Sequence, residues 1–255
     1  MRHLVLAFAA GVCLAAPAFA AEKPAHPSMQ ATATSDEPGK GDAKSDDKPK
    51  LDKADIAAAP ILEQAVTTRH TATAGGRAIA YRATAGTLTI RDDEGKPTLS
   101  LSYVAYTAEP GKGGRARPVS FVFNGGPGSS TMWLHMGSFG PLKVDASTPE
   151  MAHPAPFRLV ANPDTLLDKT DLVFIDAPTT GLGRPLGKAE PKDFFGVDQD
   201  LDAFTKAIRR YLSINGRWNS PKFLIGESYG TLRAAGLANS LQQGGVQLNG
   251  VTLVS

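Results

Sequence analysis

The stretch KFLIGESYGTLRAAG, residues 222–236, decides the fold and raises the first functional question. It begins with a short apolar run typical of a buried strand, and the residues after Ser228 fit a helix. Between the two, Gly226 and Gly230 flank Ser228 in a Gly-x-Ser-x-Gly frame. A tight turn in this setting pushes the serine into a strained, exposed position. The pattern therefore predicts a nucleophilic serine, against the alternative of a glycine-rich turn with an incidental serine.

The residues next to Ser228 fit the same geometry. We expect a Cβ at Gly226 or Gly230 to clash with the neighbouring strand and helix, so glycine is required at both positions. The backbone N–H of Tyr229 would point toward the same space as the serine hydroxyl, beside a helix N-terminus.

The segments around this turn predict an α/β fold. Four short apolar runs do not alternate with polar residues, which indicates strands buried on both faces, as in a parallel sheet. They cover residues 119–124, 171–176, 222–226 and 251–255. An antiparallel meander is predicted from about Thr67 to Ala108, with a turn at 91–97. We therefore expect a mostly parallel sheet with an antiparallel N-terminal edge.

Two helices are predicted between these strands. The second runs from Tyr229 to about Gln242 and ends at Gly244-Gly245. The first covers 198–212, with its apolar residues along one face. Its charges complement the helix dipole, with acidic residues near the start and basic ones near the end: Asp198, Asp200, Asp202, Arg209 and Arg210.

A second glycine-rich stretch, FVFNGGPGSSTMWLHMGSFGP at residues 121–141, directly follows a predicted strand. Such a loop can bring backbone N–H groups close to an anion, and an oxyanion hole needs two of these donors. A tight structural turn alone would explain Pro127 and Gly128 but not the whole run. The two stretches together therefore indicate acyl-transfer chemistry.

At these residues the sequence resembles the serine carboxypeptidases, secreted α/β-hydrolases that remove C-terminal residues from peptides. The resemblance rests on NGGPGSS at residues 124–130 and on GESYG at residues 226–230. A third landmark is DLVFIDAPTTGLGRP at residues 171–185, a strand that ends in Asp-x-Pro before a glycine-rich loop. The similarity covers about Thr67 to Ser255 and implies the α/β-hydrolase fold.

The resemblance also implies roles for single residues. Ser228 would be the nucleophile, and the backbone N–H groups of Gly126 and Tyr229 would form the oxyanion hole. The terminal carboxylate of the substrate would be held by Asn124, Gly125 and Glu227. Of these groups, Glu227 can donate a hydrogen bond to a carboxylate only when it is protonated, so binding should favour acidic pH.

Two positions depart from the family pattern. Ser129 stands where the family usually has a cysteine, so the corresponding disulfide is absent. Ser138 stands where many members have a glutamate that forms an acid pair with the glutamate next to the nucleophile. The strongly acidic pH preference of such members therefore does not follow for this chain.

The general base is the part of a serine triad that this sequence does not supply. In α/β-hydrolases the catalytic histidine follows the serine in the chain. Here all five histidines precede Ser228, namely His3, His26, His70, His135 and His153. We expect His135 to line a pocket or to pack. We also expect this chain to be the N-terminal part of a longer protein, with the catalytic Asp and His beyond Ser255. Because losing the base from a serine triad costs about 10⁶ in turnover, the 255 residues alone should have little or no peptidase activity.

The N-terminal segments predict export. Residues 1–20 combine Arg2, an apolar run and a small-x-small end at Ala18–Ala20, as in a signal peptide cleaved near Ala20. Residues 21–60 are rich in Lys, Asp, Pro, Ala and Ser and predict a disordered linker, which leaves 61–255 as the folded part. The one cysteine, Cys13, would be lost with the signal peptide, so disulfides and a cysteine nucleophile are excluded. We expect a periplasmic or extracellular protein.

Two other functions stay open on the residues alone. The first is an esterase or other acyl hydrolase of the same fold, although Asn124 and Glu227 suit a substrate with a terminal carboxylate. The second is a non-catalytic envelope binding protein. The expected partners are peptides with a free C-terminus, while the oligomeric state stays open. No metal or organic cofactor is implied. A formal net charge of +2 gives no reason to expect nucleic acid, and no apolar run is long enough for a membrane span.

Overall fold

The computed structural model describes residues 59–109, 116–145 and 157–255. The predicted signal peptide, 1–20, and all but the last two residues of the predicted linker, 21–60, lie outside the described residues.

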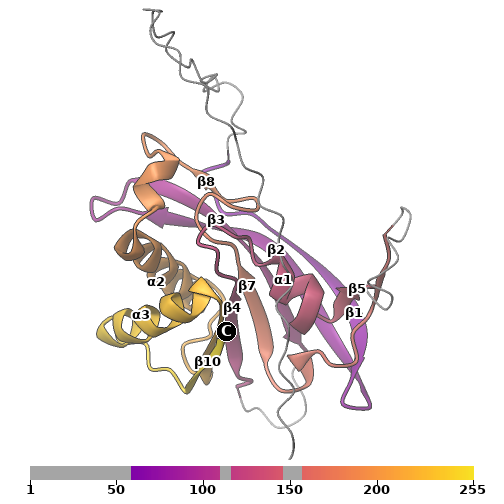
Figure 1. The fold of residues 1–255 in the computed structure, drawn as a ribbon. Coiled ribbons are helices and arrows are strands. Elements are labelled where there is room, and N and C mark those ends of the chain that lie inside the picture. The colour runs from indigo at the N-terminus through magenta and orange to yellow at the C-terminus, as the bar shows by residue number, and fades with distance from the viewer. Residues whose placement is uncertain (1–58, 110–115, 146–156) are drawn as a thin grey trace, which may run out of the picture. The chain divides into compact units, whose positions relative to one another are not determined.

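Eight of the described strands form one mixed sheet (Figure 1). Seven of them follow each other in the order β1-β2-β3-β7-β4-β9-β10, and β8 pairs with β3. Their bounds are β1 Ala65–Ala74, β2 Arg77–Arg91, β3 Pro97–Ala108, β4 Val119–Phe123, β7 Asp171–Ile175, β8 Arg184–Pro185, β9 Lys222–Glu227 and β10 Gly250–Val254.

The N-terminal edge of this sheet is antiparallel, as predicted. β1, β2 and β3 form a meander, and β3 pairs with β7, also antiparallel. The turn between β2 and β3 is closed by Asp92, whose carboxylate accepts from the backbone N–H groups of Glu94 and Lys96. An aspartate at the start of a turn commonly makes this contact, and here it fixes the hairpin.

The central strands are parallel, which confirms the second part of the prediction. β7, β4, β9 and β10 lie side by side in the same direction. Every residue of β4 and β7 is buried, as expected of strands covered on both faces. Because parallel strands end at the same edge of a sheet, the loops after β4, β7 and β9 meet there.

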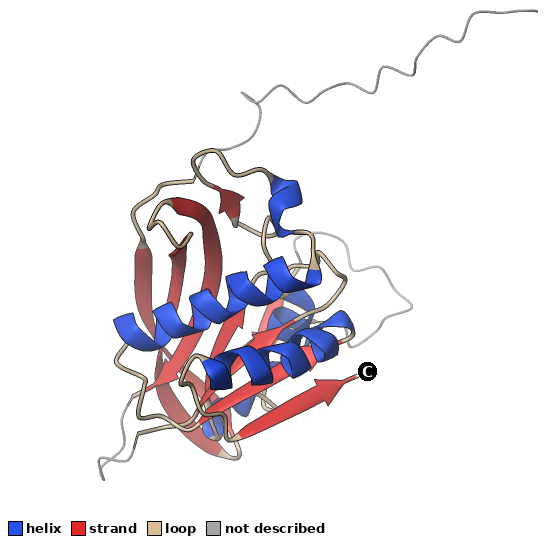
Figure 2. Ribbon diagram, turned by 90° about the vertical axis from the view of Figure 1, so that its left-hand side faces the viewer, coloured by secondary structure: helices blue, strands red, loops and turns tan. Residues whose placement is uncertain are grey.

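Two long helices cover one face of the sheet (Figure 2). They are α2, Val197–Ile214, and α3, Tyr229–Gln243, and both agree with the predicted helices to within two residues. The main hydrophobic core lies between them and the sheet, with Phe121, Phe204 and Leu237 among its buried residues. No described helix has the length and apolar character needed to cross a membrane.

A second, smaller core covers the opposite face. Leu134 and Phe139 pack there against sheet residues such as Val122 and Phe174. Leu134 ends the short helix α1, Met132–Leu134, which continues into the π-helical turn η2, His135–Phe139. The remaining elements are β5 Leu142–Val144, β6 Leu159–Ala161, η3 Leu166–Asp168 and η4 Pro191–Phe194. β5 and β6 pair as a two-stranded sheet that the sequence pattern did not predict.

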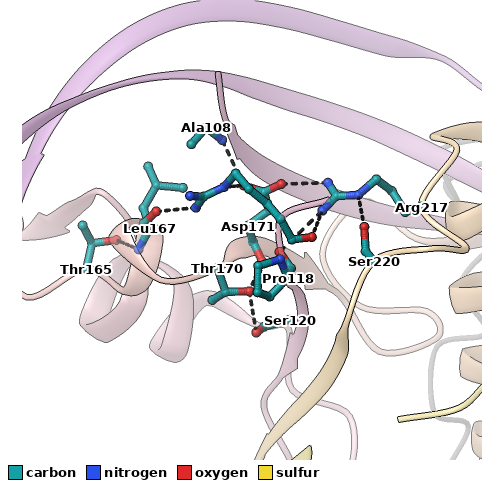
Figure 3. A network of polar contacts seen from close by, with 10 residues as sticks. Ala108, Pro118, Ser120, Thr165, Leu167, Thr170, Asp171, Arg217 and Ser220 are labelled. Carbon is teal, nitrogen blue, oxygen red and sulfur yellow. Dashed lines mark hydrogen bonds and ion pairs between the residues drawn. The ribbon is translucent and has the colours of Figure 1, made fainter. Parts of the chain in front are cut away.

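The starting ends of the central strands are tied together by a buried carboxylate, that of Asp171 (Figure 3). One oxygen accepts from Arg117 Nε at 2.8 Å and from the backbone N–H of Ala108 at 3.0 Å. The other accepts from Arg217 Nη1 at 2.7 Å. Arg217 also donates from Nη2 to the carbonyl oxygen of Arg117 at 2.9 Å. These contacts connect the end of β3 with the starts of β4 and β7 and with the loop before β9.

Candidate active site

Ser228 stands at a sharp turn between β9 and α3. Its φ of 55° and ψ of −122° place a non-glycine residue in a rarely adopted backbone conformation, and its side chain is exposed. The backbone N–H of Ser228 donates to the carbonyl oxygen of Val254 at 2.8 Å, which holds the turn against β10. This is the exposed, strained serine that the Gly-x-Ser-x-Gly pattern predicted.

The two glycines that flank Ser228 are required by close backbone contacts. A Cβ at Gly226 would lie 2.0 Å from the carbonyl oxygen of Gly230 in α3. A Cβ at Gly230 would lie 2.9 Å from the carbonyl oxygen of Phe123 in β4. Both distances are shorter than real Cβ contacts, so the clash with strand and helix predicted for these positions is confirmed.

The glycine loop after β4 lies against the start of α3. Phe123, the last residue of β4, is paired with Gly226 of β9, so the two strands deliver their loops to the same place. A Cβ on Gly125 would lie 2.4 Å from the backbone nitrogen of Tyr229 and 2.6 Å from the carbonyl oxygen of Glu227. Only a glycine allows this approach, which brings the two predicted motifs together at Ser228.

Three backbone N–H groups at this junction have no acceptor among the described residues. They belong to Gly125, Gly126 and Tyr229. Tyr229 is the first residue of α3, so its N–H also carries the positive end of the helix dipole. Free N–H groups beside a helix N-terminus can bind an anion, and two of these three are the donors expected for the oxyanion hole.

Asn124 and Glu227, which were expected to hold a carboxylate, are in contact with each other. Asn124 Nδ2 donates to Glu227 Oε2 at 2.9 Å, and Asn124 Oδ1 accepts from the backbone N–H of Leu134 at 3.0 Å. Asn124 is 2% exposed, whereas Glu227 is only partly buried. The amide of Asn124 is thereby fixed in orientation, and its second N–H has no partner among the described residues.

Ser138 makes no contact that replaces the missing family glutamate. It lies in η2, and its carbonyl oxygen accepts from Asn162 Nδ2 at 2.6 Å. Among the described residues, no second carboxyl group forms a hydrogen bond with Glu227, whose side chain accepts from the neutral amide of Asn124. Glu227 therefore forms a carboxyl–amide pair with Asn124.

Asp176, the aspartate of the third landmark, connects β7 to the segment after the glycine loop. Its Oδ1 accepts from the backbone N–H of Thr131 at 2.8 Å, and its Oδ2 accepts from Ser102 Oγ at 2.8 Å. The hydroxyl of Thr131 in turn donates to the carbonyl oxygen of Ile175. Asp176 thus anchors the end of the glycine loop, a role that the sequence pattern did not reveal.

His135 packs in the structure and lines a pocket, as expected. Its ring stacks on Phe174 with centroids 4.5 Å apart, and its Nε2 lies 2.7 Å from the hydroxyl oxygen of Tyr106. It lines a cavity of about 360 Å³ between η2 and strands β2, β3 and β7. Burial lowers the pKa of His135 to about 4, although the negative charge of Asp176 acts in the opposite direction. Burial likewise raises the pKa of the Tyr106 hydroxyl to about 12.

The low pKa of His135 predicts a loss of stability in acid. The unfolded chain accepts a proton on this ring near pH 6.5 and the folded protein only near pH 4, so the unfolded state binds more protons between these values. Stability should therefore fall as pH falls from 6.5 to 4, by roughly 3 kcal/mol for the whole shift. The free energy of unfolding, measured with urea, should differ less between pH 7 and pH 4.5 for His135→Gln than for wild type. His70→Gln, at an exposed histidine of β1, should keep the wild-type difference.

No described residue accepts or donates a hydrogen bond at the Ser228 hydroxyl. His70 lies on β1 and contacts Thr68 Oγ1 and the ring of Tyr81. His3, His26 and His153 lie outside the described residues. In the described part of the chain, the exposed serine and the free N–H groups therefore have no histidine beside them.

Beside the turn at Ser228 lies a cavity of about 380 Å³. The ring of Tyr229, the glycine loop at Pro127 and Gly128, and the aromatic rings of Phe194 and Phe195 line it. It offers space for part of a bound molecule next to Ser228. Within the described ranges, no group of three or more His, Cys, Asp or Glu side chains is placed to hold a metal ion.

Comparison with known proteins identifies similar chains. The family model described as serine carboxypeptidase matches residues 77–252. Pheromone-processing carboxypeptidase KEX1 of Saccharomyces cerevisiae is 31% identical over 123 residues, which are 48% of this chain and 16% of the relative. The crystal structure of Kex1(delta)p, a prohormone-processing carboxypeptidase from Saccharomyces cerevisiae, gives a TM-score of 0.53 at 22% identity. The matched region is 68% of this chain and 38% of the related chain, and the similarity confirms the α/β-hydrolase fold. The matched parts span less than half of either relative.

Proposed function

Because this chain belongs to the serine carboxypeptidase family, we propose that its whole protein is a serine-type carboxypeptidase. It releases C-terminal residues from peptides through an acyl-enzyme on Ser228. The contact of the Asn124 and Glu227 side chains, directly beside the exposed serine and the free amides, carries this proposal. It joins a nucleophile to a set of groups that fit the terminal carboxylate of a peptide.

The reaction follows from the positions of these groups. Ser228 Oγ attacks the carbonyl carbon of the last peptide bond, and the oxygen that becomes negative is bound by the N–H groups of Gly126 and Tyr229. The general base takes the proton of the Ser228 hydroxyl and passes it to the nitrogen of the leaving amino acid as the C–N bond breaks, and the acyl group stays on Ser228. Water attacks the ester in the same way and restores the free serine.

The terminal carboxylate of the substrate is held on the leaving-group side. The N–H of Gly125 and the second N–H of Asn124 donate to it, and Glu227 adds a donor when it is protonated. Hydrogen bonds to a charged group contribute about 1.5–3 kcal/mol each, which is enough to select free C-termini.

The general base comes from the rest of the protein. We propose a histidine, oriented by an aspartate, in the part that follows Ser255, in the chain order of α/β-hydrolases. The matched region covers 38% of the related structure, which leaves room for both residues. Export of the protein is a further proposal, supported by the signal-peptide pattern of residues 1–20.

The test compares two substrates that differ only at the C-terminus. The full-length protein should cleave a peptide with a free carboxylate with a kcat/KM at least about tenfold above that of its C-terminal amide, since one charged hydrogen bond already gives this factor. Equal rates for acid and amide, or a higher kcat/KM for simple esters without a carboxylate, would favour the esterase instead. Absence of turnover from the purified full-length protein on all three would favour a binding protein.

A further inference from the structure

We propose that Arg233, held by Asp200, is a positioning residue for the Gly125 N–H, the donor assigned above to the substrate carboxylate. The inference rests on the proposed function, because it concerns recognition of that carboxylate. Arg233 lies on the second turn of α3, five residues after Ser228, and Asp200 lies on the first turn of α2. Arg233 is buried, and Asp200 also lines the cavity beside the turn at Ser228.

Each of the three guanidinium nitrogens of Arg233 donates a hydrogen bond, and the residue is almost completely buried. The residue is 1% exposed, and Asp200 is 7% exposed. Arg233 Nε donates to Asp200 Oδ2 at 2.7 Å and Nη2 donates to Oδ1 at 3.0 Å, which makes a two-point ion pair. The carbon at the centre of the guanidinium lies 4.4 Å from the ring centre of Phe204. The group therefore has a single, fixed orientation.

The remaining nitrogen of Arg233 reaches the glycine loop. Nη1 donates to the backbone carbonyl oxygen of Asn124 at 2.6 Å. This carbonyl and the N–H of Gly125 belong to one planar peptide group and point in opposite directions. Fixing the carbonyl inside the protein therefore turns the Gly125 N–H outward, where it has no acceptor among the described residues.

The charge of Arg233 also acts on this peptide group electronically. A charged donor on the carbonyl polarises the amide, and hydrogen bonds in such chains strengthen one another. The N–H of Gly125 then becomes a better donor to a carboxylate. Asp200 balances the buried positive charge, so the pair adds no net charge beneath the site.

If the Arg233 and Asp200 side chains served only to fill space, apolar residues would be expected at these positions. Burying two charges carries a large desolvation penalty, and apolar residues of similar volume often replace buried pairs without loss of stability. Arg233 combines two bonds to Asp200 with one bond to Asn124, which needs the planar, five-donor guanidinium. A lysine carries the same charge but has a single nitrogen, so it cannot make these three contacts in fixed directions. These contacts favour a role in positioning over a role in filling space.

The test uses the double variant Asp200→Leu/Arg233→Met in the full-length protein, which removes both charges together and keeps the volume. The ratio of kcat/KM for a free-acid peptide to that for its C-terminal amide should fall about tenfold, which is the effect of losing one hydrogen bond to a charged group. Because Asp200 also lines the cavity beside Ser228, the test compares this ratio and not the amide rate alone. Arg233→Lys should lower the ratio in the same direction, and it covers the case in which the double variant does not fold.

A second ion pair on α2 provides the matched control. Arg210 forms a two-point pair with Glu63 at 2.9 and 2.8 Å, but on the surface and away from the glycine loop. The double variant Glu63→Leu/Arg210→Met should keep the wild-type ratio.

Three further outcomes separate this inference from the proposed function. If the Arg233 variants prefer the free acid as strongly as wild type, the positioning role is overturned. The same holds if a variant loses cleavage of the acid and of the amide equally. Both outcomes leave the proposed function intact. A wild-type protein that cleaves acid and amide equally would contradict the proposed function and the inference with it.

Discussion

Replacement of Ser228 by alanine in the full-length protein should lower kcat for a peptide with a free C-terminus by about 10⁶. The hydroxyl at this turn is exposed, in a strained backbone conformation, beside N–H groups that are free to bind the developing oxyanion. Removing it leaves no atom that can form the acyl-enzyme, while the groups that bind the substrate stay in place. KM should therefore change much less than kcat.

Ser213→Ala is a suitable control for this change. Ser213 is an exposed serine near the end of α2, whose hydroxyl donates to the carbonyl oxygen of Arg209 at 3.0 Å. The chain runs from this end of α2 to the start of β9, whereas Ser228 follows the end of β9, so the Ser213 variant should keep wild-type kcat. A Ser228→Ala protein with more than about one hundredth of wild-type turnover would exclude an acyl-enzyme on this serine, because nucleophile loss costs far more.

Replacement of Asp171 by alanine should lower the free energy of unfolding by about 3–5 kcal/mol. Its carboxylate is the shared partner of Arg117 and Arg217, and it also accepts the backbone N–H of Ala108 (Figure 3). Without it, two positive charges stay close together in a largely buried place. Urea unfolding of wild type and variant at the same pH measures the difference.

The matched control is Asp164→Ala. Asp164 also forms an ion pair, with Lys143 at 3.8 Å, but its side chain is 83% exposed. Exposed pairs contribute about 0–1 kcal/mol, so this variant should stay close to wild type. A similar small loss for Asp171→Ala would mean that the network contributes little and that the strand starts are held by the sheet alone.

The parts of this protein that the sequence predicted are those with a local pattern. The unbroken apolar runs of β4, β7 and β9 indicated strands buried on both faces, and Gly226 and Gly230 marked the turn that carries Ser228. Each of these signals lies within a few consecutive residues, because strand burial and the tight turn limit which side chains fit at neighbouring positions.

Contacts between distant residues could not be predicted in this way. Asp200 was interpreted as a charge that complements the dipole of its helix, yet its carboxylate is buried against Arg233, 33 residues later. Arg233 reaches the carbonyl oxygen of Asn124 across 109 residues of sequence. Nothing next to either residue marks it as buried, since an isolated charge on a helix is usually exposed. Only the packing of α2 on α3 brings these groups together.

The most direct test of the central claim is chemical labelling of the full-length protein with a fluorophosphonate, followed by mass spectrometry of its peptides. A serine activated as a nucleophile forms a stable covalent adduct with this reagent. We expect one adduct, on Ser228, and loss of peptide hydrolysis in proportion to labelling. Peptide hydrolysis that survives complete labelling of Ser228, or an inactivating adduct on another residue, would contradict the assignment of Ser228 as the nucleophile.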